Sequence, residues 1–141
     1  MGCYNSTVVD GSPADVWAMI RNFHELGWAA GVVETAEKVG DLAGDQLGAK
    51  RVLNGVFHET LCALDDVNHI IRYSIDEGPG PLAKGEFSGY IGQVRLRSVS
   101  DTGQTFVEWS SKWSTGSSEI KGFCDPIYQA LLGAMKAAAA K

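Results

Sequence analysis

The sequence has few cysteines, no excess of positive charge and no long hydrophobic run, and each absence excludes a class of protein. The formal net charge is −5, so no basic surface is available to attract nucleic-acid phosphates or an anionic membrane. No apolar run approaches the roughly 20 residues that span a bilayer. The N-terminus has the pattern of a strand and not of a signal peptide. We therefore expect a cytoplasmic protein with no nucleic-acid partner and no insertion into a membrane.

Three cysteines, Cys3, Cys62 and Cys124, are far apart in the sequence and odd in number. They lack the paired spacing of a zinc or redox motif, and the three histidines do not cluster with them. We expect reduced thiols in the core, no metal site and no cofactor.

The composition is that of a globular protein. The chain has 141 residues, of which 45% are hydrophobic and 21% charged. No linker or low-complexity segment divides it, so we expect a single domain over residues 1–141.

Most of the chain has the pattern of β-strands separated by glycine, proline, asparagine and aspartate turns. The predicted strands are 4–10, 32–39, 49–54, 58–64, 69–76, 87–99 and 105–114. Helical signals interrupt this pattern near the start. Ser12 is a predicted N-cap and Pro13 a predicted first helical residue, and a second short helix is predicted at 24–29.

The last segment, 117–141, has the pattern of one long amphipathic helix. Apolar residues recur there at three- and four-residue steps: Ile120, Phe123, Ile127, Leu131, Ala134, Met135 and Ala138. This stripe has to be buried against the sheet. Alternation assigns Tyr90, Gly92, Val94 and Leu96 to the inner face of their strand. Because Gly92 has no side chain on that face, we take it as a sign of a cavity.

Three segments, 12–29, 57–76 and 106–113, carry a resemblance to a known family. Together with the order of elements, they are similar to the START-like, birch-pollen-allergen-related (SRPBCC) superfamily. The chain most resembles its polyketide cyclase/dehydrase group, the plant abscisic-acid receptors and the lachrymatory-factor synthases. The resemblance implies an α+β helix-grip fold, in which a curved antiparallel sheet of about seven strands (β-α-α-β6-α) wraps around the C-terminal helix and encloses a cavity.

The resemblance also implies site residues. Glu59 and Tyr90 match a pocket glutamate and a pocket tyrosine, and Arg51 falls where the synthases carry a catalytic arginine. Glu108 resembles a second pocket glutamate of the receptors. Ala29 occupies the position of the lysine that holds the receptors' ligand carboxylate, so binding of that hormone is not expected.

The remaining ligand contacts are expected from apolar and aromatic side chains around the same space: Trp28, Leu61, Tyr73, Ile75, Phe123, Ile127 and Leu131. If Glu108 points inward, Trp109 and Trp113 point outward and suggest a homodimer surface or cover from a neighbouring element. The segment 78–81, rich in glycine and proline, occupies the position of a gating loop.

Three functions remain open at this point. The first is a binding protein that holds a small, largely hydrophobic molecule oriented by Glu59, Tyr90 and Glu108. The second is a cofactor-free cyclase, dehydratase or isomerase acting on a carbonyl substrate, with Glu59 as acid or base, Tyr90 as proton donor and Arg51 as oxyanion clamp. The third is a non-catalytic interaction protein with a filled core.

Overall fold

The computed structural model describes residues 1–141 and consists of seven strands, two α-helices and two short 3₁₀-helices. In chain order these are β1 (Gly2–Val9), α1 (Pro13–Ile20), η1 (Gly27–Ala29), β2 (Ala36–Val39), β3 (Lys50–Leu53), β4 (Phe57–Asp65), β5 (Ile70–Glu77), η2 (Gly80–Leu82), β6 (Ile91–Ser98), β7 (Thr105–Lys112) and α2 (Ile120–Ala139).

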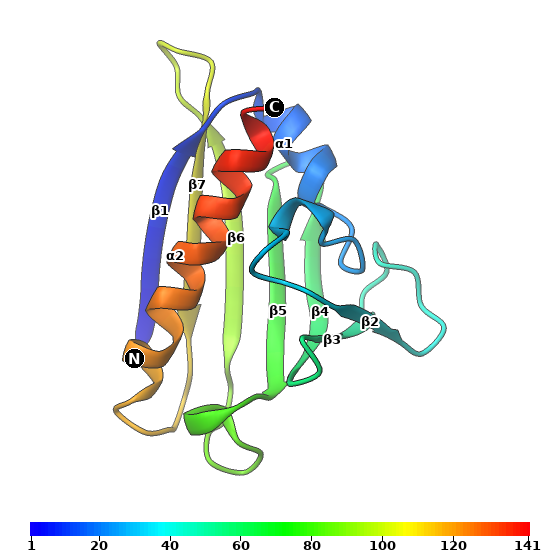
Figure 1. Ribbon diagram of the computed structural model, residues 1–141, viewed down its shortest axis with the longest axis vertical. Coiled ribbons are helices and arrows are strands. Elements are labelled where there is room, and N and C mark those ends of the chain that lie inside the picture. The colour runs from blue at the N-terminus through cyan, green and yellow to red at the C-terminus, as the bar shows by residue number, and fades with distance from the viewer.

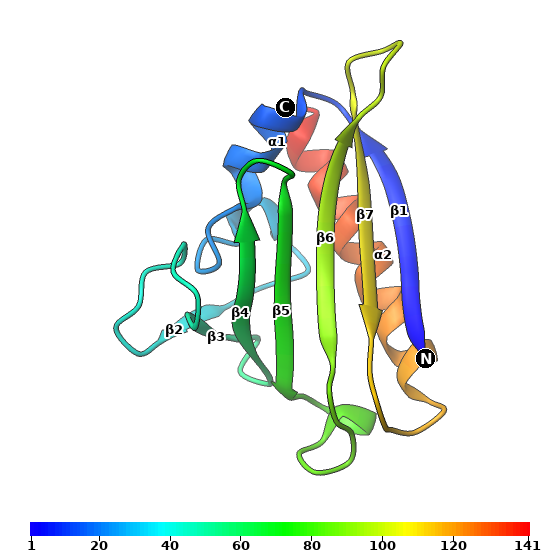
Figure 2. The same ribbon diagram turned by 180° about the vertical axis from the view of Figure 1, so that it is seen from behind.

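The strands form one antiparallel sheet in the order β1-β7-β6-β5-β4-β3-β2. The sheet curves, and both α-helices lie on its inner face, with α2 running along β1 and β7 (Figure 1). The opposite face carries no helix (Figure 2). No helix is both long enough and apolar enough to cross a membrane.

Helix α1 begins where the predicted cap places it. The Ser12 side chain accepts a hydrogen bond from the backbone N–H of Asp15 at 3.2 Å, and Pro13 occupies the first turn. The helix buries Val16, Trp17 and Ile20 against the sheet. The second predicted helix is shorter than expected, because only Gly27–Ala29 forms a 3₁₀ turn.

Helix α2 starts three residues later than the predicted segment, and its buried stripe is rotated relative to the prediction. Its buried side chains are Ile120, Cys124, Tyr128, Leu131, Leu132 and Met135. Phe123 and Ile127 lie at the edge of this stripe and are only half-buried. The rotation brings the hydroxyl of Tyr128 into the core.

The predicted strand at 32–39 is reduced to the exposed edge strand β2. The preceding residues cross over the inner face of the sheet, and the side chain of Asn54 binds them. Its Nδ2 donates to the carbonyl oxygen of Val32 at 3.0 Å, and its Oδ1 accepts from the backbone N–H groups of Glu34 and Thr35. These hydrogen bonds replace the strand pairing that the apolar pattern predicted.

The faces of β7 are the reverse of those implied by the resemblance. Trp109 is 4% exposed and Trp113 is 7% exposed, so both lie in the core, and the side chain of Glu108 lies on the outer face. Two indole rings bury far more apolar area than one glutamate, and burying a carboxylate opposes folding. The two tryptophans therefore do not form the outward surface from which a homodimer was expected.

Gly92 also has a different role from the one expected. It lies directly opposite Tyr73 in the pairing of β5 with β6, and a side chain at Gly92 would overlap the tyrosine ring. The glycine thus accommodates Tyr73 and leaves no empty space.

The predicted core location is wrong for one thiol, because Cys62 shares the outer face with Thr60 and is exposed, whereas Cys3 and Cys124 are buried.

Candidate ligand cavity

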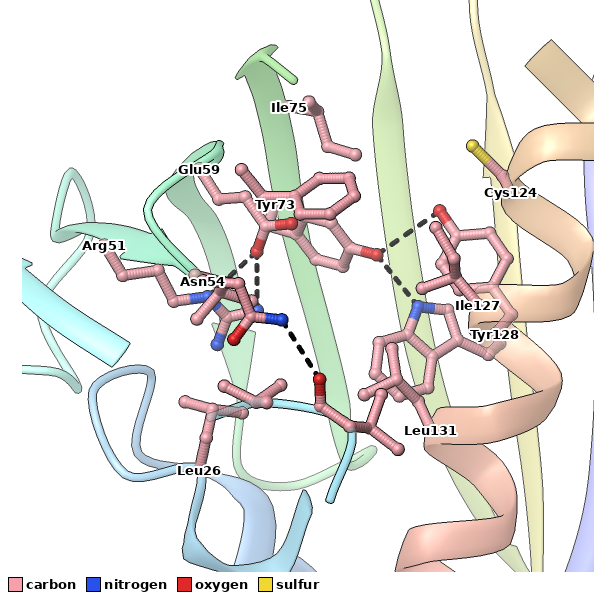
Figure 3. A pocket seen from close by; sticks show the side chains of 15 residues that line it. Leu26, Arg51, Asn54, Glu59, Tyr73, Ile75, Cys124, Ile127, Tyr128 and Leu131 are labelled. Carbon is pink, nitrogen blue, oxygen red and sulfur yellow. Dashed lines mark hydrogen bonds and ion pairs between the residues drawn. The ribbon is translucent and has the colours of Figure 1, made fainter. Parts of the chain in front are cut away.

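A cavity of about 60 Å³ lies between the inner face of the sheet, α2 and the segment that follows α1. Most of its lining is apolar or aromatic: Leu26, Val32, Val33, Leu53, Phe57, Tyr73, Ile75, Trp109, Cys124, Ile127, Tyr128 and Leu131. The remaining lining residues are Arg51, Asn54 and Glu59. Figure 3 shows these side chains converging from β3, β4, β5 and α2.

The volume is small for a ligand site. A buried water needs roughly 10–15 Å³ on this measure, so there is room for about four waters. A second cavity of about 20 Å³ lies beside the first and shares Leu26, Arg51, Tyr73 and Trp109 with it. Typical ligand pockets measure roughly 300–1,000 Å³, so a drug-sized molecule requires the wall to move.

The main polar feature of the cavity is an ion pair between Arg51 and Glu59, which face each other across β3 and β4. Arg51 is 8% exposed and Glu59 is 6% exposed. Nε and Nη2 of Arg51 lie 2.9 Å and 2.7 Å from the same carboxylate oxygen, Oε1. Nη1 of Arg51 donates to the backbone carbonyl of Phe23 at 3.0 Å. No hydrogen bond from within the chain reaches Oε2 of Glu59.

Burial and the ion pair shift the pKa of Glu59 in opposite directions. Removal from water raises the pKa of the Glu59 carboxyl, and the Arg51 guanidinium partly reverses this shift. The guanidinium is itself covered by an aromatic ring, since its Cζ lies 3.8 Å from the centroid of Phe23. The site therefore holds a carboxyl group with one oxygen in contact with Arg51 and the other without a hydrogen bond from the chain.

A second polar group, which we call the tyrosine cluster, consists of Tyr73, Tyr90 and Tyr128. The indole N–H of Trp109 donates to the hydroxyl of Tyr73 at 2.9 Å, and Tyr73 donates to Tyr128 at 3.4 Å. The hydroxyls of Tyr128 and Tyr90 are also hydrogen-bonded. Burial raises the pKa of all three phenols, so they are neutral at physiological pH.

The segment 31–35 forms part of the cavity wall. Val32 and Val33 line the cavity, and Leu26 and Val33 also line a depression on the outer surface. These two side chains are therefore shared by the inner space and the surface. Asn54, at a backbone φ of +53°, binds the segment through its side-chain amide.

Six of the residues expected at a site line this cavity. They are Arg51, Glu59, Tyr73, Ile75, Ile127 and Leu131. Tyr90 does not line it, because Tyr128 stands between its hydroxyl and the cavity. Leu61 is 1% exposed and lies in the core away from the space.

Three further expected residues also lie elsewhere. Trp28 lines only the smaller cavity. Phe123 packs against Gly80 in the expected lid segment, and neither borders the cavity. Glu108 accepts a hydrogen bond from the Tyr4 hydroxyl at 2.6 Å and pairs with Arg97 at 3.5 Å on the outer face. The expectation that Glu108 belongs to the pocket is corrected by its position.

Sequence reasoning missed Tyr128, Trp109 and Asn54. Tyr128 follows Cys124 by four residues, and this spacing indicates a second possible buried face of α2. The prediction overlooked it because it assigned Ile127 to the buried face. The prediction placed Trp109 on the outer face because it assumed that the neighbouring Glu108 points inward. The asparagine-glycine pair at Asn54 indicated a turn, but nothing in the pattern indicated that its side chain binds residues 32–35.

Comparison with known proteins finds a family and solved structures that match this architecture. The chain matches the family described as polyketide cyclase / dehydrase and lipid transport over residues 3–140. A solved structure of a protein from Nitrosospira multiformis is 40% identical, with 99% of this chain and 96% of that chain covered and a TM-score of 0.95.

More distant structures show the same fold. XoxI from Bacillus cereus is 21% identical, with 99% of this chain and 96% of that chain covered and a TM-score of 0.80. The allergen structure Ara h 8.0201 is 12% identical, with 99% of this chain and 97% of that chain covered and a TM-score of 0.76. No curated protein matches the chain. The predicted helix-grip fold and the superfamily resemblance are confirmed.

Proposed function

The chain belongs to the polyketide cyclase/dehydrase and lipid transport family, and on this premise we propose that it binds a small, largely hydrophobic molecule between its sheet and α2. The observation that carries the proposal is an internal cavity with twelve hydrophobic residues among the fifteen that line it. Its polar groups are concentrated at the Arg51–Glu59 end, so an apolar molecule with one polar group fits its chemistry.

The energy for binding comes from moving apolar ligand surface out of water, which contributes roughly 25 cal/mol per Å². Against this stands the cost of enlarging the cavity. The wall formed by Val32 and Val33 is held by the side chain of Asn54 and by two backbone hydrogen bonds to the Ala29 carbonyl. We expect displacement of this wall to cost less than separation of the sheet from α2, because separation would expose the six buried side chains of that helix.

Native mass spectrometry of protein purified from its own host tests the proposal. We expect an adduct of a small organic molecule on the wild-type chain. The variant Ile127→Phe adds a ring to the cavity wall and is expected to lose most of the adduct. Ala130→Phe adds the same ring to an exposed position of α2 and is the matched control. An adduct equally abundant on all three proteins contradicts binding in the cavity.

A cofactor-free cyclase, dehydratase or isomerase is the second candidate. It is supported by the buried carboxylate of Glu59, whose raised pKa suits proton transfer, and by two neutral phenols, Tyr73 and Tyr128, that line the same cavity. In this mechanism Tyr128 takes the donor role first assigned to Tyr90. Arg51 orients Glu59 and does not act as a free oxyanion clamp, since Glu59 and Phe23 occupy it.

The two candidates differ in what happens to the bound molecule. A carrier returns the co-purified compound unchanged, whereas an enzyme converts it or its precursor. Glu59→Gln is expected to abolish conversion while Oε1 of the amide still accepts from Arg51. Incubation of the recovered compound with both proteins, followed by mass analysis, distinguishes a carrier from a catalyst.

A further inference from the structure

Oε2 of Glu59, a residue in the lining of the cavity, is a hydrogen-bond acceptor that receives no hydrogen bond from the chain. Both contacts from Arg51 fall on Oε1. Oε2 is not among the fully buried polar atoms left without a partner, so water can reach it. A ligand that displaces this water loses affinity unless it donates a hydrogen bond in its place, so a ligand with a donor group is favoured.

We infer that the cavity selects uncharged ligands that carry a hydroxyl or N–H group, which donates to Oε2 of Glu59, and that it rejects carboxylates. This inference rests on the proposed function. It specifies the class of ligand, because an apolar cavity alone accepts any molecule of suitable size.

Arg51 is the sole cation among the residues that line the cavity, and it is engaged on three sides. Its Nε and Nη2 contact Glu59, its Nη1 contacts the Phe23 carbonyl, and the Phe23 ring covers the guanidinium. A ligand carboxylate therefore finds no free cation, and the Glu59 charge repels it. Ala29, which is fully buried, supplies no ammonium either.

Three other donor groups of the lining have acceptors within the chain. Trp109 donates to Tyr73, and Tyr73 donates to Tyr128. The Asn54 amide donates to the Val32 carbonyl. The polar groups that the cavity offers to a ligand are therefore mainly hydrogen-bond acceptors.

Three aromatic probes of similar size separate these properties. Phenol donates a hydrogen bond, fluorobenzene has the same shape without a donor, and benzoate carries the excluded charge. Because phenol and fluorobenzene require the same movement of the wall, the ratio of their dissociation constants reports the net contribution of the hydroxyl group, its hydrogen bond less its desolvation. Binding is followed at neutral pH by NMR chemical shifts of the indole N–H of Trp109, which lies at the cavity.

We expect phenol to bind about tenfold or more tightly than fluorobenzene, as for a hydrogen bond to a charged group, and benzoate to cause no saturable shift. Glu59→Gln is expected to reduce the phenol preference to about twofold, because the NH2 group that replaces Oε2 donates hydrogen bonds and cannot accept one from phenol. Glu37→Gln, on the exposed strand β2, is the matched control and is expected to retain the wild-type ratio.

The outcomes separate the inference from the proposed function. Equal binding of phenol and fluorobenzene to the wild-type chain overturns the donor requirement and leaves the hydrophobic cavity in place. Saturable binding of benzoate overturns the exclusion of carboxylates. If none of the probes binds, both the proposed function and the inference fail. The wild-type ratio needs no variant, so the inference stays testable even if Glu59→Gln does not fold.

Discussion

The Arg51–Glu59 pair and the tyrosine cluster are two buried polar groups on the same cavity, and they differ in how completely their hydrogen bonds are satisfied. The hydroxyls of the tyrosine cluster are neutral and hydrogen-bond to one another, and the indole N–H of Trp109 donates to one of them. The ion pair is charged, yet it leaves Oε2 of Glu59 without a partner.

This difference indicates which group is built for stability and which for recognition. A satisfied neutral network fixes the positions of aromatic rings and offers little to a ligand. A buried ion pair costs desolvation free energy, and a hydrophobic replacement is often at least as stable. Its unused acceptor is therefore best explained by an occupant of the cavity. Four predictions test this contrast.

The largest effect is expected from breaking the ion pair. Arg51→Ala leaves the Glu59 charge buried and uncompensated, and we expect a loss of about 3–5 kcal/mol in the free energy of unfolding. Chemical denaturation measures it. Arg97→Ala removes the partner of Glu108 on the outer face and is expected to cost no more than about 1 kcal/mol. Similar losses for both variants would mean that burial does not distinguish the two pairs.

A smaller loss is expected in the tyrosine cluster. Tyr128→Phe removes the hydroxyl that links Tyr73 with Tyr90, and we expect a loss of about 1–3 kcal/mol because buried hydroxyls lose a partner. Tyr4→Phe removes an exposed hydroxyl bonded to Glu108 and is expected to change stability by about 0.5 kcal/mol or less. Thermal unfolding of both variants decides the matter, and an unchanged Tyr128→Phe would refute the network.

The wall over the cavity is expected to respond more weakly in stability and more clearly in dynamics. Asn54→Gly keeps the left-handed backbone accessible but removes the side chain that binds Val32, Glu34 and Thr35. We expect a loss of about 1 kcal/mol and faster hydrogen exchange at the amides of Glu34 and Thr35. Asn68→Gly, in the turn after β4, is the control. Unchanged exchange at both amides would show that Asn54 does not hold the wall.

The smallest effect concerns pH. Because the folded-state pKa of Glu59 is raised, the unfolded chain ionises at lower pH than the folded chain. The contribution of this carboxyl to stability is thus full below its ordinary pKa of 4.5 and is lost as the pH rises through the folded-state value. Arg51 on β3 opposes the shift, and Asp76 on β5 adds to it.

Glu59→Gln removes this titration. We expect the wild-type stability, measured relative to that of Glu59→Gln, to decrease as the pH is raised from 4.5. Denaturation curves across this range give the difference. A relative stability that increases with pH would mean that the ion pair outweighs the burial of the carboxylate.

Much of the fold could be predicted because it rests on local signals. The cap at Ser12, the turn residues between strands and the alternation in β5 and β6 depend on neighbouring residues only. The prediction failed for residues 32–35, where the apolar pattern fits a strand equally well. Their actual position depends on Asn54, which is distant in the sequence.

The candidate site was predicted only in part, because it too depends on contacts between residues that are distant in the sequence. Glu59 and Arg51 were recognised through a family resemblance, and their pairing follows from the register of β3 with β4. Glu108 was misplaced because the orientation of β7 depends on the burial of Trp109 and Trp113. That choice is made by the whole core and not by any single strand.

The sequence by itself determined the elements, the helix-grip order and the presence of a long helix against a sheet, because hydrophobic periodicity and turn chemistry act over a few residues. Only the tertiary structure decided the rotation of α2 that brings in Tyr128, the filling of Gly92 by Tyr73 and the single unused oxygen of Glu59. These features depend on how distant side chains share a limited volume and a limited number of hydrogen bonds, and periodicity carries no information about either.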